Sequence, residues 1–334
     1  MFQLFIAETE LAKIPGLSDA GANVALLPYT APADADMLFF ERPKASKSLP
    51  FDPSGHPSPA IITRASMLEA GFSKGVVCAG LTVEPVAPHT SLGSDTGHDT
   101  RFENAVPNYK TLAAKAKALA EQWNQDEKYA VLGESIVGGT TTAMLVLRAL
   151  GCVGTVSSAG PVNPLTLKEE IWQKTSKRLG ITCGGLKGCG LETASLLGDP
   201  MQIAVASYAA ALPRDVKVVL AGGTQMMAVA AIMRDMGVTR DILVATTKYV
   251  HKDPTSCFEA YAHQIGVDWY AAPLDFSKSR FKGLSEYEIG FIKEGVGAGG
   301  AVWYAQHLGV SMERIQSRTE EIYEQLSNCK EQTK

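Results

Sequence analysis

The residues best suited to chemistry are a glutamate and a run of glycines near the end of the chain. Glu294 is followed at once by GVGAGG, residues 295–300. A backbone without side chains lets a substrate approach closely, so the Glu294 carboxylate is a candidate general base. The alternative is an exposed glutamate at a helix end. The run also contains a GxGxxG pattern, but too little chain follows it to build a dinucleotide-binding strand–helix–strand unit.

A second glycine-rich turn, GESIVGGTTT, spans residues 133–142, where it follows a predicted strand and opens a predicted helix. Backbone N–H groups at a helix N-terminus attract anions, so the segment from Gly138 to Thr140 predicts a phosphate site. The turn is close to a Walker A loop, but Gly139 stands where the phosphate-binding lysine belongs. We therefore expect a monophosphate rather than a triphosphate. A tight turn that binds nothing is the alternative.

Three shorter turns of small residues have the same character. Their sequences are SSAG at residues 157–160, GGLKG at 184–188 and AGGT at 221–224. Turns that follow the strands of a parallel sheet can line one crevice, although each alone is more often a simple loop. Lys168 and Lys187 are the cations that lie nearest to these turns in the sequence, and they are the candidates for holding a phosphate.

The elements that must position these turns alternate between short apolar runs and helical patterns, which is typical of a parallel sheet covered by helices. Strands are predicted at residues 76–79, 129–132, 155–158, 216–221, 242–246 and 269–272. Helices are predicted at residues 109–123, 140–150, 165–179, 200–211, 254–263 and 311–326. The fold class that follows is α/β, with a doubly wound, mostly parallel, Rossmann-like sheet.

The chain is expected to divide into three parts. Residues 1–70 form an N-terminal arm and part of a smaller helical domain, residues 71–283 form the α/β core, and residues 284–334 form a C-terminal helical segment that carries Glu294. The two end segments are expected to pack together. Within the first part, residues 28–59 are rich in proline, which predicts a long ordered loop rather than core.

Composition excludes several classes of function. The chain has 334 residues, a net charge of -4 and no cluster of Lys and Arg, so a nucleic-acid partner is not expected. The N-terminus lacks the features of a signal peptide, and no apolar run reaches the roughly 18 residues of a membrane span; we expect a cytoplasmic protein without membrane contact. The six cysteines and six histidines lack metal-ligand spacing, so no metal is expected.

Several motifs, in order along the chain, resemble those of the nicotinate-nucleotide:dimethylbenzimidazole phosphoribosyltransferases. GESIVGGTTTA is similar to that family's GEMGIGNTTTA, and EGVGA is similar to its EGTGA. With SSAGPVNPLTLK, GDPMQ and AGGTQM, the similarity spans residues from about 23 to 306 and looks like a divergent archaeal and cyanobacterial branch. Ile136 and Gly139 depart from the better-known motif, and the loop after Cys78 lacks its ADHG sequence. These departures leave the aromatic acceptor open.

The resemblance implies an enzyme that moves a phosphoribosyl group from nicotinate mononucleotide to an aromatic nitrogen base, such as 5,6-dimethylbenzimidazole, for the lower ligand of a cobamide. It implies a homodimer that needs no cofactor and no metal. Glu294 aligns with the family's general base, Glu134 with a glutamate beside the ribose, and Lys168 with a lysine at the phosphate. The expected substrate contacts are Glu134, Gly138, Gly139, Thr140, Thr141, Ser158, Lys168, Gly222, Gly223, Gly295 and Gly297.

Two other functions are compatible with parts of the sequence. A carrier or regulator that binds a nucleotide or a cobamide precursor without turnover would have no use for a base, and the presence of Glu294 speaks against it. An NAD-linked oxidoreductase that uses the GxGxxG pattern would need a strand before Gly295. The sequence therefore favours a pentosyltransferase.

Overall fold

The strands form one parallel sheet of seven strands in the computed structural model, which describes residues 1–18, 24–52 and 54–331. Their order across the sheet is β3-β2-β1-β4-β5-β6-β7. The bounds are β1 Phe2–Ala7, β2 Lys74–Gly80, β3 Thr90–Ser91, β4 Tyr129–Ser135, β5 Lys217–Ala221, β6 Ile242–Thr247 and β7 Asp268–Ala272. The chain winds outward from β1 in one direction and from β4 in the other, so the predicted doubly wound parallel sheet is confirmed.

The switch point of the sheet lies between β1 and β4. In this pair Phe5 lies opposite Glu134, and Ile6 lies opposite Ser135. Every residue of β1 is buried, because helices cover both faces of the sheet. In a doubly wound sheet the crevice for a ligand opens at the carboxyl ends of the strands beside such a switch point.

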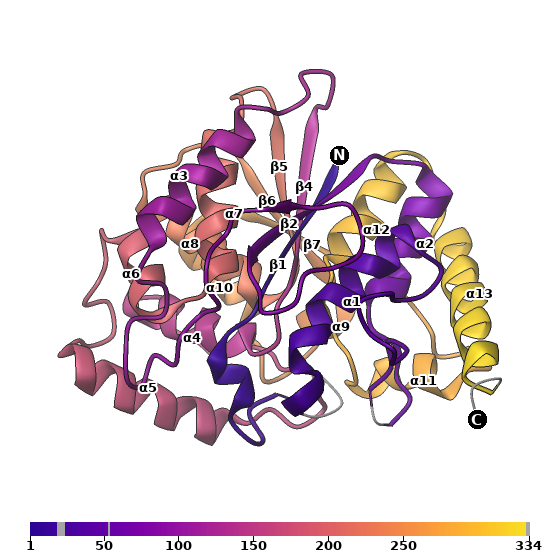
Figure 1. The fold of residues 1–334 in the computed structure, drawn as a ribbon, viewed down its shortest axis with the longest axis horizontal. Helices are drawn as coiled ribbons and strands as arrows, with labels where there is room; N and C mark the ends of the chain where they lie inside the picture. Colours follow the sequence, from indigo (N-terminus) through magenta and orange to yellow (C-terminus); the bar gives the residue numbers. More distant parts are fainter. Residues whose placement is uncertain (19–23, 53, 332–334) are drawn as a thin grey trace.

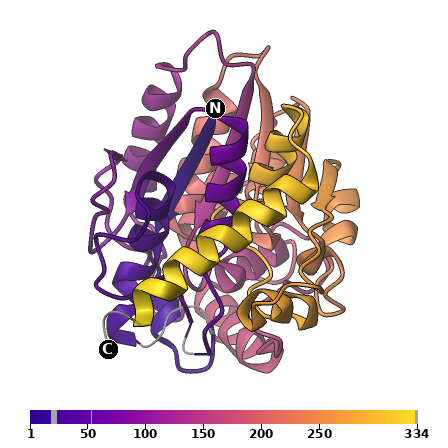
Figure 2. The same ribbon diagram turned by 90° about the vertical axis from the view of Figure 1, so that its right-hand side faces the viewer.

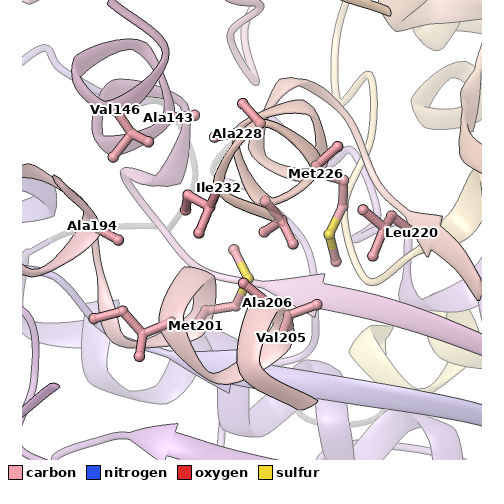
Figure 3. Packing of buried hydrophobic residues seen from close by; sticks show 14 of the residues in the cluster. Ala143, Val146, Ala194, Met201, Val205, Ala206, Leu220, Met226, Ala228 and Ile232 are labelled. Atoms are coloured by element: carbon pink, nitrogen blue, oxygen red, sulfur yellow. The ribbon is translucent and has the colours of Figure 1, made fainter. Parts of the chain in front are cut away.

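One face of the sheet is covered by helices from the middle of the chain. They are α3 Tyr109–Ala120, α4 Gly139–Ala149, α5 Leu165–Leu179, α6 Gly190–Leu197, α7 Pro200–Ala211, α8 Thr224–Asp235 and α10 Phe258–Ile265. Figure 3 shows how small residues such as Ala206 and Ala228 let these helices approach one another around Met201 and Met226. The side chains of Phe5 and Leu132 point into this core.

The other face is covered by helices from both ends of the chain, which lie side by side (Figures 1 and 2). They are α1 Leu27–Phe39, α2 Ala60–Ala70, α12 Ala298–His307 and α13 Met312–Glu331. Phe2, Leu4 and Ile6 of β1 point into this second core. The remaining short helices are η1 Glu10–Lys13, η2 Val24–Leu26, α9 Lys248–His251, α11 Lys282–Ser285 and η3 Glu286–Ile289. No helix in the described ranges has the length and apolar character that a membrane crossing requires.

Glycines allow α12 to lie directly on the sheet. A Cβ atom on Gly299 would come within 2.1 Å of the carbonyl carbon of Thr246 in β6, and one on Gly300 within 2.2 Å of the Cβ of Ala221 in β5. Contacts this short are not possible for a real side chain. Part of the GVGAGG run therefore serves the packing of α12, and this packing fixes the position of the preceding residue Glu294.

The strand predicted at residues 155–158 is wrong, because this segment is irregular in the structure. Its carbonyl groups are bonded by side chains instead of a neighbouring strand. The Asn163 side chain donates to the carbonyl of Val156 at 2.7 Å, and Lys168 donates to the carbonyl of Ser157 at 2.9 Å. Side-chain donors thus satisfy the backbone where a sheet ladder was expected.

Two further expectations fail at their boundaries. The loop predicted for residues 28–59 is wrong in its first part, where α1 forms with Pro28 in the first turn, a position at which its missing N–H costs nothing. The helix predicted at residues 254–263 begins only at Phe258. Before it, the Asp253 carboxylate accepts from the N–H and hydroxyl of Thr255, which holds a turn. The helices predicted at residues 165–179 and 200–211 match α5 and α7.

Candidate active site

A cavity of about 190 Å³ opens at the carboxyl edge of the sheet, beside the switch point between β1 and β4. Its walls come from the end of β4 and the start of α4, from the turns at residues 157–159 and 223–225, from α1 and the arm that follows it, and from residues 292–296. Eight of the residues predicted from the sequence line it together: Glu134, Gly138, Gly139, Thr140, Ser158, Gly223, Glu294 and Gly295.

Glu294 lies in the cavity wall, partly exposed, just before α12 begins. Its carboxylate accepts hydrogen bonds from the backbone N–H groups of Gly295 and Gly299, each at 3.2 Å, and from the Thr246 hydroxyl at 3.2 Å. Burial raises the pKa of Glu294 to about 7, although these donors act in the opposite direction by stabilising the anion. A carboxyl group that titrates near neutral pH is well matched to the work of a general base.

Glu134 is the second-last residue of β4 and is almost fully buried beside Glu294. Burial raises its pKa well above the ordinary value, and the negative charges of Glu294 and Asp199 raise it further. Its Oε1 atom has no hydrogen-bond partner among the described residues. The neutral form of a carboxyl group can donate as well as accept a hydrogen bond, and Glu134 is one of the residues that line the cavity.

Two buried aspartates support this region. Asp34 of α1 lines the cavity and accepts from the hydroxyls of Ser58, at 2.5 Å, and Ser135, at 2.8 Å. Burial raises the pKa of Asp34 to about 6. Asp199 caps α7 and accepts from the Thr142 hydroxyl at 2.6 Å, which fixes the first turn of α4. Burial raises the pKa of Asp199 to about 6 as well.

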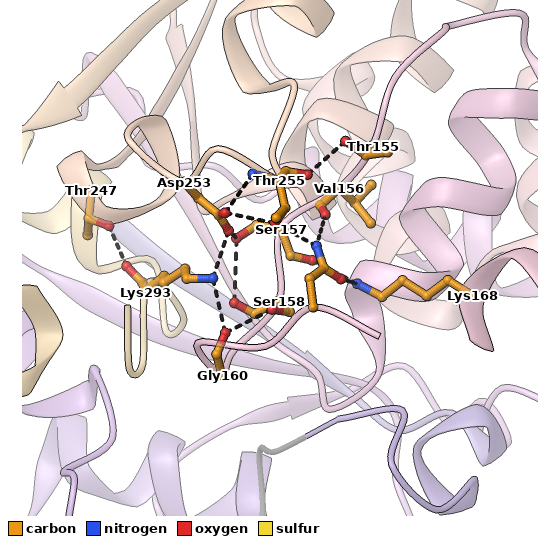
Figure 4. Close-up of polar contacts among 11 residues, drawn as sticks. Thr155, Val156, Ser157, Ser158, Gly160, Lys168, Thr247, Asp253, Thr255 and Lys293 are labelled. Carbon is orange, nitrogen blue, oxygen red and sulfur yellow. Dashed lines mark hydrogen bonds and ion pairs between the residues drawn. The ribbon is translucent and has the colours of Figure 1, made fainter. Parts of the chain in front are cut away.

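The two lysines near the turn at residues 157–160 have different surroundings (Figure 4). Lys168 is fully buried outside the cavity wall, and its Nζ donates to the Ser157 carbonyl and to Asn163 Oδ1, both at 2.9 Å. Burial lowers its pKa to about 7. Lys293 instead lines the cavity, where its Nζ donates to Asp253 Oδ2 at 2.7 Å and to the Gly160 carbonyl at 3.0 Å.

The phosphate contact predicted for Lys168 therefore has no support from its position. Lys293 is the one lysine among the described residues of the cavity wall, and no arginine is found there. Sequence reasoning missed Lys293, although it immediately precedes Glu294 in KEGVGAGG. Lys187 is exposed and also lies outside the cavity wall.

Three other predicted contacts serve packing instead of lining the cavity. Thr141 is buried in the first turn of α4. A Cβ on Gly222 would lie 3.2 Å from Glu134 Oε1, so this glycine makes room for the glutamate. A Cβ on Gly297 would lie 2.8 Å from the Cα of Gly133, where the two glycine-rich segments touch. The glycines that approach each other thus bring both glutamates into one site.

Helix α1 and the arm after it supply a wall that was not predicted. Tyr29 and Asp34 of α1 and His56 of the arm all line the cavity. The His56 ring is buried, with its nitrogens 2.6 Å from Asp52 Oδ2 and 2.8 Å from Glu286 Oε2, and this arrangement ties the arm to the segment before Glu294. Within the described ranges, no group of three or more His, Cys, Asp or Glu side chains is arranged to hold a metal ion.

Comparison with known proteins finds full-length relatives in archaea. No family model matches the sequence. A UPF0284 protein of Pyrococcus furiosus is 45% identical over 328 residues, which cover 98% of each chain. A UPF0284 protein of Thermococcus kodakarensis is 44% identical and covers 99% of this chain and 98% of its own length. Another, from Methanosarcina mazei, is 39% identical and covers 96% of this chain and 93% of its own.

Solved structures with the same fold include a nicotinate-nucleotide-dimethylbenzimidazole phosphoribosyltransferase of Thermus thermophilus. It superposes with a TM-score of 0.58 and 14% sequence identity, covering 96% of this chain and 82% of that chain. A second structure, of CobT from the same organism, gives the same TM-score and identity and covers 83% of that chain. The resemblance predicted from the motifs is confirmed at the level of the fold.

Proposed function

We propose that this chain, which belongs to the UPF0284 protein family, is a phosphoribosyltransferase. It moves the phosphoribosyl group of nicotinate mononucleotide to an aromatic nitrogen base, 5,6-dimethylbenzimidazole or a related one, and it releases nicotinate. The product is an α-riboside 5′-phosphate for the lower ligand of a cobamide. The observation that carries the proposal is Glu294, a carboxyl group with a pKa of about 7 in a cavity lined by glycine-rich turns.

The chemistry of the donor explains why one base is enough. In nicotinate mononucleotide the ribose is attached to a positively charged pyridinium nitrogen, which leaves as a neutral ring and needs no proton. The acceptor nitrogen attacks the anomeric carbon from the opposite face, so the β-nucleotide becomes an α-riboside. As the acceptor becomes cationic, Glu294 takes its N–H proton and stabilises the developing charge.

Glu134 has a different part in this proposal. Burial and the nearby acids raise the pKa of its carboxyl group well above the ordinary value, which favours the neutral form. A neutral carboxyl group can both donate and accept a hydrogen bond, so we assign Glu134, which lines the cavity, to a hydroxyl of the ribose. The two glutamates thus have separate roles, Glu294 at the acceptor nitrogen and Glu134 at the ribose.

The phosphate lies at the positive side of the cavity. The first turn of α4, at Gly139 and Thr140, places the positive end of a helix at the cavity, and Lys293, which is paired with Asp253, is the lysine in the wall. A monophosphate has no pyrophosphate charge to neutralise, so the reaction needs no Mg²⁺. The acceptor base lies against α1, where Tyr29 provides an aromatic surface.

The experiment is to incubate the purified protein with nicotinate mononucleotide and a panel of acceptors, and to separate the products by chromatography. The panel contains 5,6-dimethylbenzimidazole, other benzimidazoles, adenine and a phenol. We expect free nicotinate and a new riboside phosphate in equal amounts with at least one acceptor. Binding of nicotinate mononucleotide without turnover on any acceptor would instead favour a carrier. Light scattering on the same sample tests the homodimer that we include in the proposal.

A further inference from the structure

Two β-branched residues bracket Glu294 in a backbone conformation that such residues rarely adopt. Ile292 has a φ of 47° and Val296 a φ of 55°, and they are the non-glycine residues with positive φ in the described chain. Branching at Cβ makes this left-handed region unfavourable, because the side chain crowds the backbone. Such strained positions persist only where the surrounding structure holds them, and they concentrate at functional sites.

The segment is held at both ends by hydrogen bonds from other parts of the chain. Before the glutamate, the N–H of Ile292 donates to the carbonyl of Ala159 at 2.8 Å, and the Thr247 hydroxyl donates to the carbonyl of Lys293. After it, the Thr63 hydroxyl donates to the carbonyl of Val296 at 2.9 Å. The two strained residues are thus tied to elements on different sides of the cavity.

The side chain of Thr63 bonds to the turn and not to its own helix. It lies in α2 and is fully buried, and its hydroxyl crosses to the turn instead of bonding to a carbonyl of its own helix. Among the described residues it is the one donor to the Val296 carbonyl. The Val296 side chain is buried too, so without Thr63 this carbonyl would be left in the core without a partner.

We propose that the turn from Ile292 to Val296 is a strained clamp that aims the Glu294 carboxylate into the cavity, and that Thr63 is the positioning residue that keeps it closed. The inference rests on the proposed function, in which Glu294 must stand within hydrogen-bond reach of the acceptor nitrogen. Without such ties the two β-branched residues would relax to the more favourable negative φ and carry Glu294 with them. Helix α2 therefore contributes to catalysis without contacting the substrate.

The test compares three threonine variants in steady-state kinetics. Thr63→Val removes the donor at nearly constant volume; we expect kcat to fall by roughly 10- to 100-fold, the effect of a small misplacement of a base, while KM for nicotinate mononucleotide stays within about twofold. Thr63→Ser keeps the hydroxyl and should restore most of kcat. Thr319→Val is the matched control, because Thr319 is equally buried in α13 but its hydroxyl bonds to Ile315 in its own helix.

A wild-type kcat in Thr63→Val would overturn the proposal, and so would an equal fall in Thr319→Val. If Thr63→Val does not fold, Thr63→Ala removes the same donor with less crowding. If the wild-type protein turns over no acceptor, the proposed function fails. The clamp is then tested without turnover, by measuring the pKa of Glu294 in a carbon-13 NMR titration. A clamp that opens changes both the burial of the carboxylate and its N–H donors, so the pKa of Glu294 should differ between Thr63→Val and the wild type; an unchanged pKa would refute the clamp.

Discussion

Replacing Glu294 with glutamine should make the protein more stable at alkaline pH and nearly inactive. The carboxyl group is buried enough that its pKa is raised from the ordinary value of 4.5 to about 7. A group whose pKa is raised by folding stabilises the folded state while it is protonated, and this stabilisation is lost as the pH rises through the folded value. Glutamine has nearly the same shape and is neutral at every pH, so Glu294→Gln does not suffer this loss.

The size of the effect follows from the two pKa values. Each unit of difference corresponds to 1.36 kcal/mol, so the interval between 4.5 and about 7 amounts to about 3 kcal/mol in total. Most of it, about 2 to 3 kcal/mol, falls between about pH 5 and about pH 8.5. The free energy of unfolding of Glu294→Gln, minus that of the wild type, should therefore grow by about 2 to 3 kcal/mol across this window.

Urea denaturation at these two pH values measures the difference, because the midpoints report stability when the slopes are equal. Glu121→Gln changes an exposed glutamate at the end of α3 and is the matched control, for which no such growth is expected. Turnover of Glu294→Gln should fall by roughly 10² to 10⁴, the usual contribution of a positioned base. A stability difference that is the same at both pH values would refute the view that Glu294 is poised near neutrality.

Three further predictions concern the phosphate, the packing of α12 and the absence of a metal requirement. Lys293→Met should raise KM for nicotinate mononucleotide by about 10- to 100-fold, since a hydrogen bond to a charged group contributes about 1.5–3 kcal/mol. Lys187→Met changes an exposed lysine outside the cavity and should leave KM unchanged. If KM of Lys293→Met equals that of the wild type, the phosphate is held by backbone groups alone. Gly299→Ala should lower the free energy of unfolding, measured by urea denaturation, by about 3 kcal/mol or more, because its Cβ would lie 2.1 Å from the Thr246 carbonyl carbon. A denaturation midpoint equal to that of the wild type would mean that α12 can shift to make room. Chelation with EDTA should leave turnover unchanged, and a loss that Mg²⁺ restores would indicate a polyphosphate substrate.

Much of the site could be predicted because its signals are local. Glycines that follow a strand and precede a helix indicate a tight turn that can bind an anion at the helix N-terminus. The turn around Gly138 and Gly139 was therefore predicted from the sequence. Glu134 and Glu294 stand inside such glycine-rich segments, and both line the cavity. Parallel strands bring their carboxyl ends to one edge, which is why segments about 160 residues apart in the chain meet there.

The parts that were missed depend on contacts between distant segments. The sequence does not show which of Lys168 and Lys293 lines the cavity; the fold places Lys293 in the wall and Lys168 outside it. Asp34 and His56 fall within residues 28–59, whose prolines predict a loop, and nothing local shows that α1 and the arm after it form part of the cavity wall. Strand β1 was missed because one short apolar run at a chain end does not show that it will lie at the centre of the sheet.

The proposed transfer of the phosphoribosyl group inverts the configuration at the anomeric carbon. The most direct measurement is carbon-13 NMR of nicotinate mononucleotide labelled at that carbon, mixed with protein and an aromatic nitrogen base. We expect the signal of the β-nucleotide to be replaced by that of an α-riboside phosphate, with one nicotinate released for each riboside formed. Release of nicotinate with the label found only in free ribose phosphate, or a β-nucleotide signal that persists with every base, would contradict the assignment.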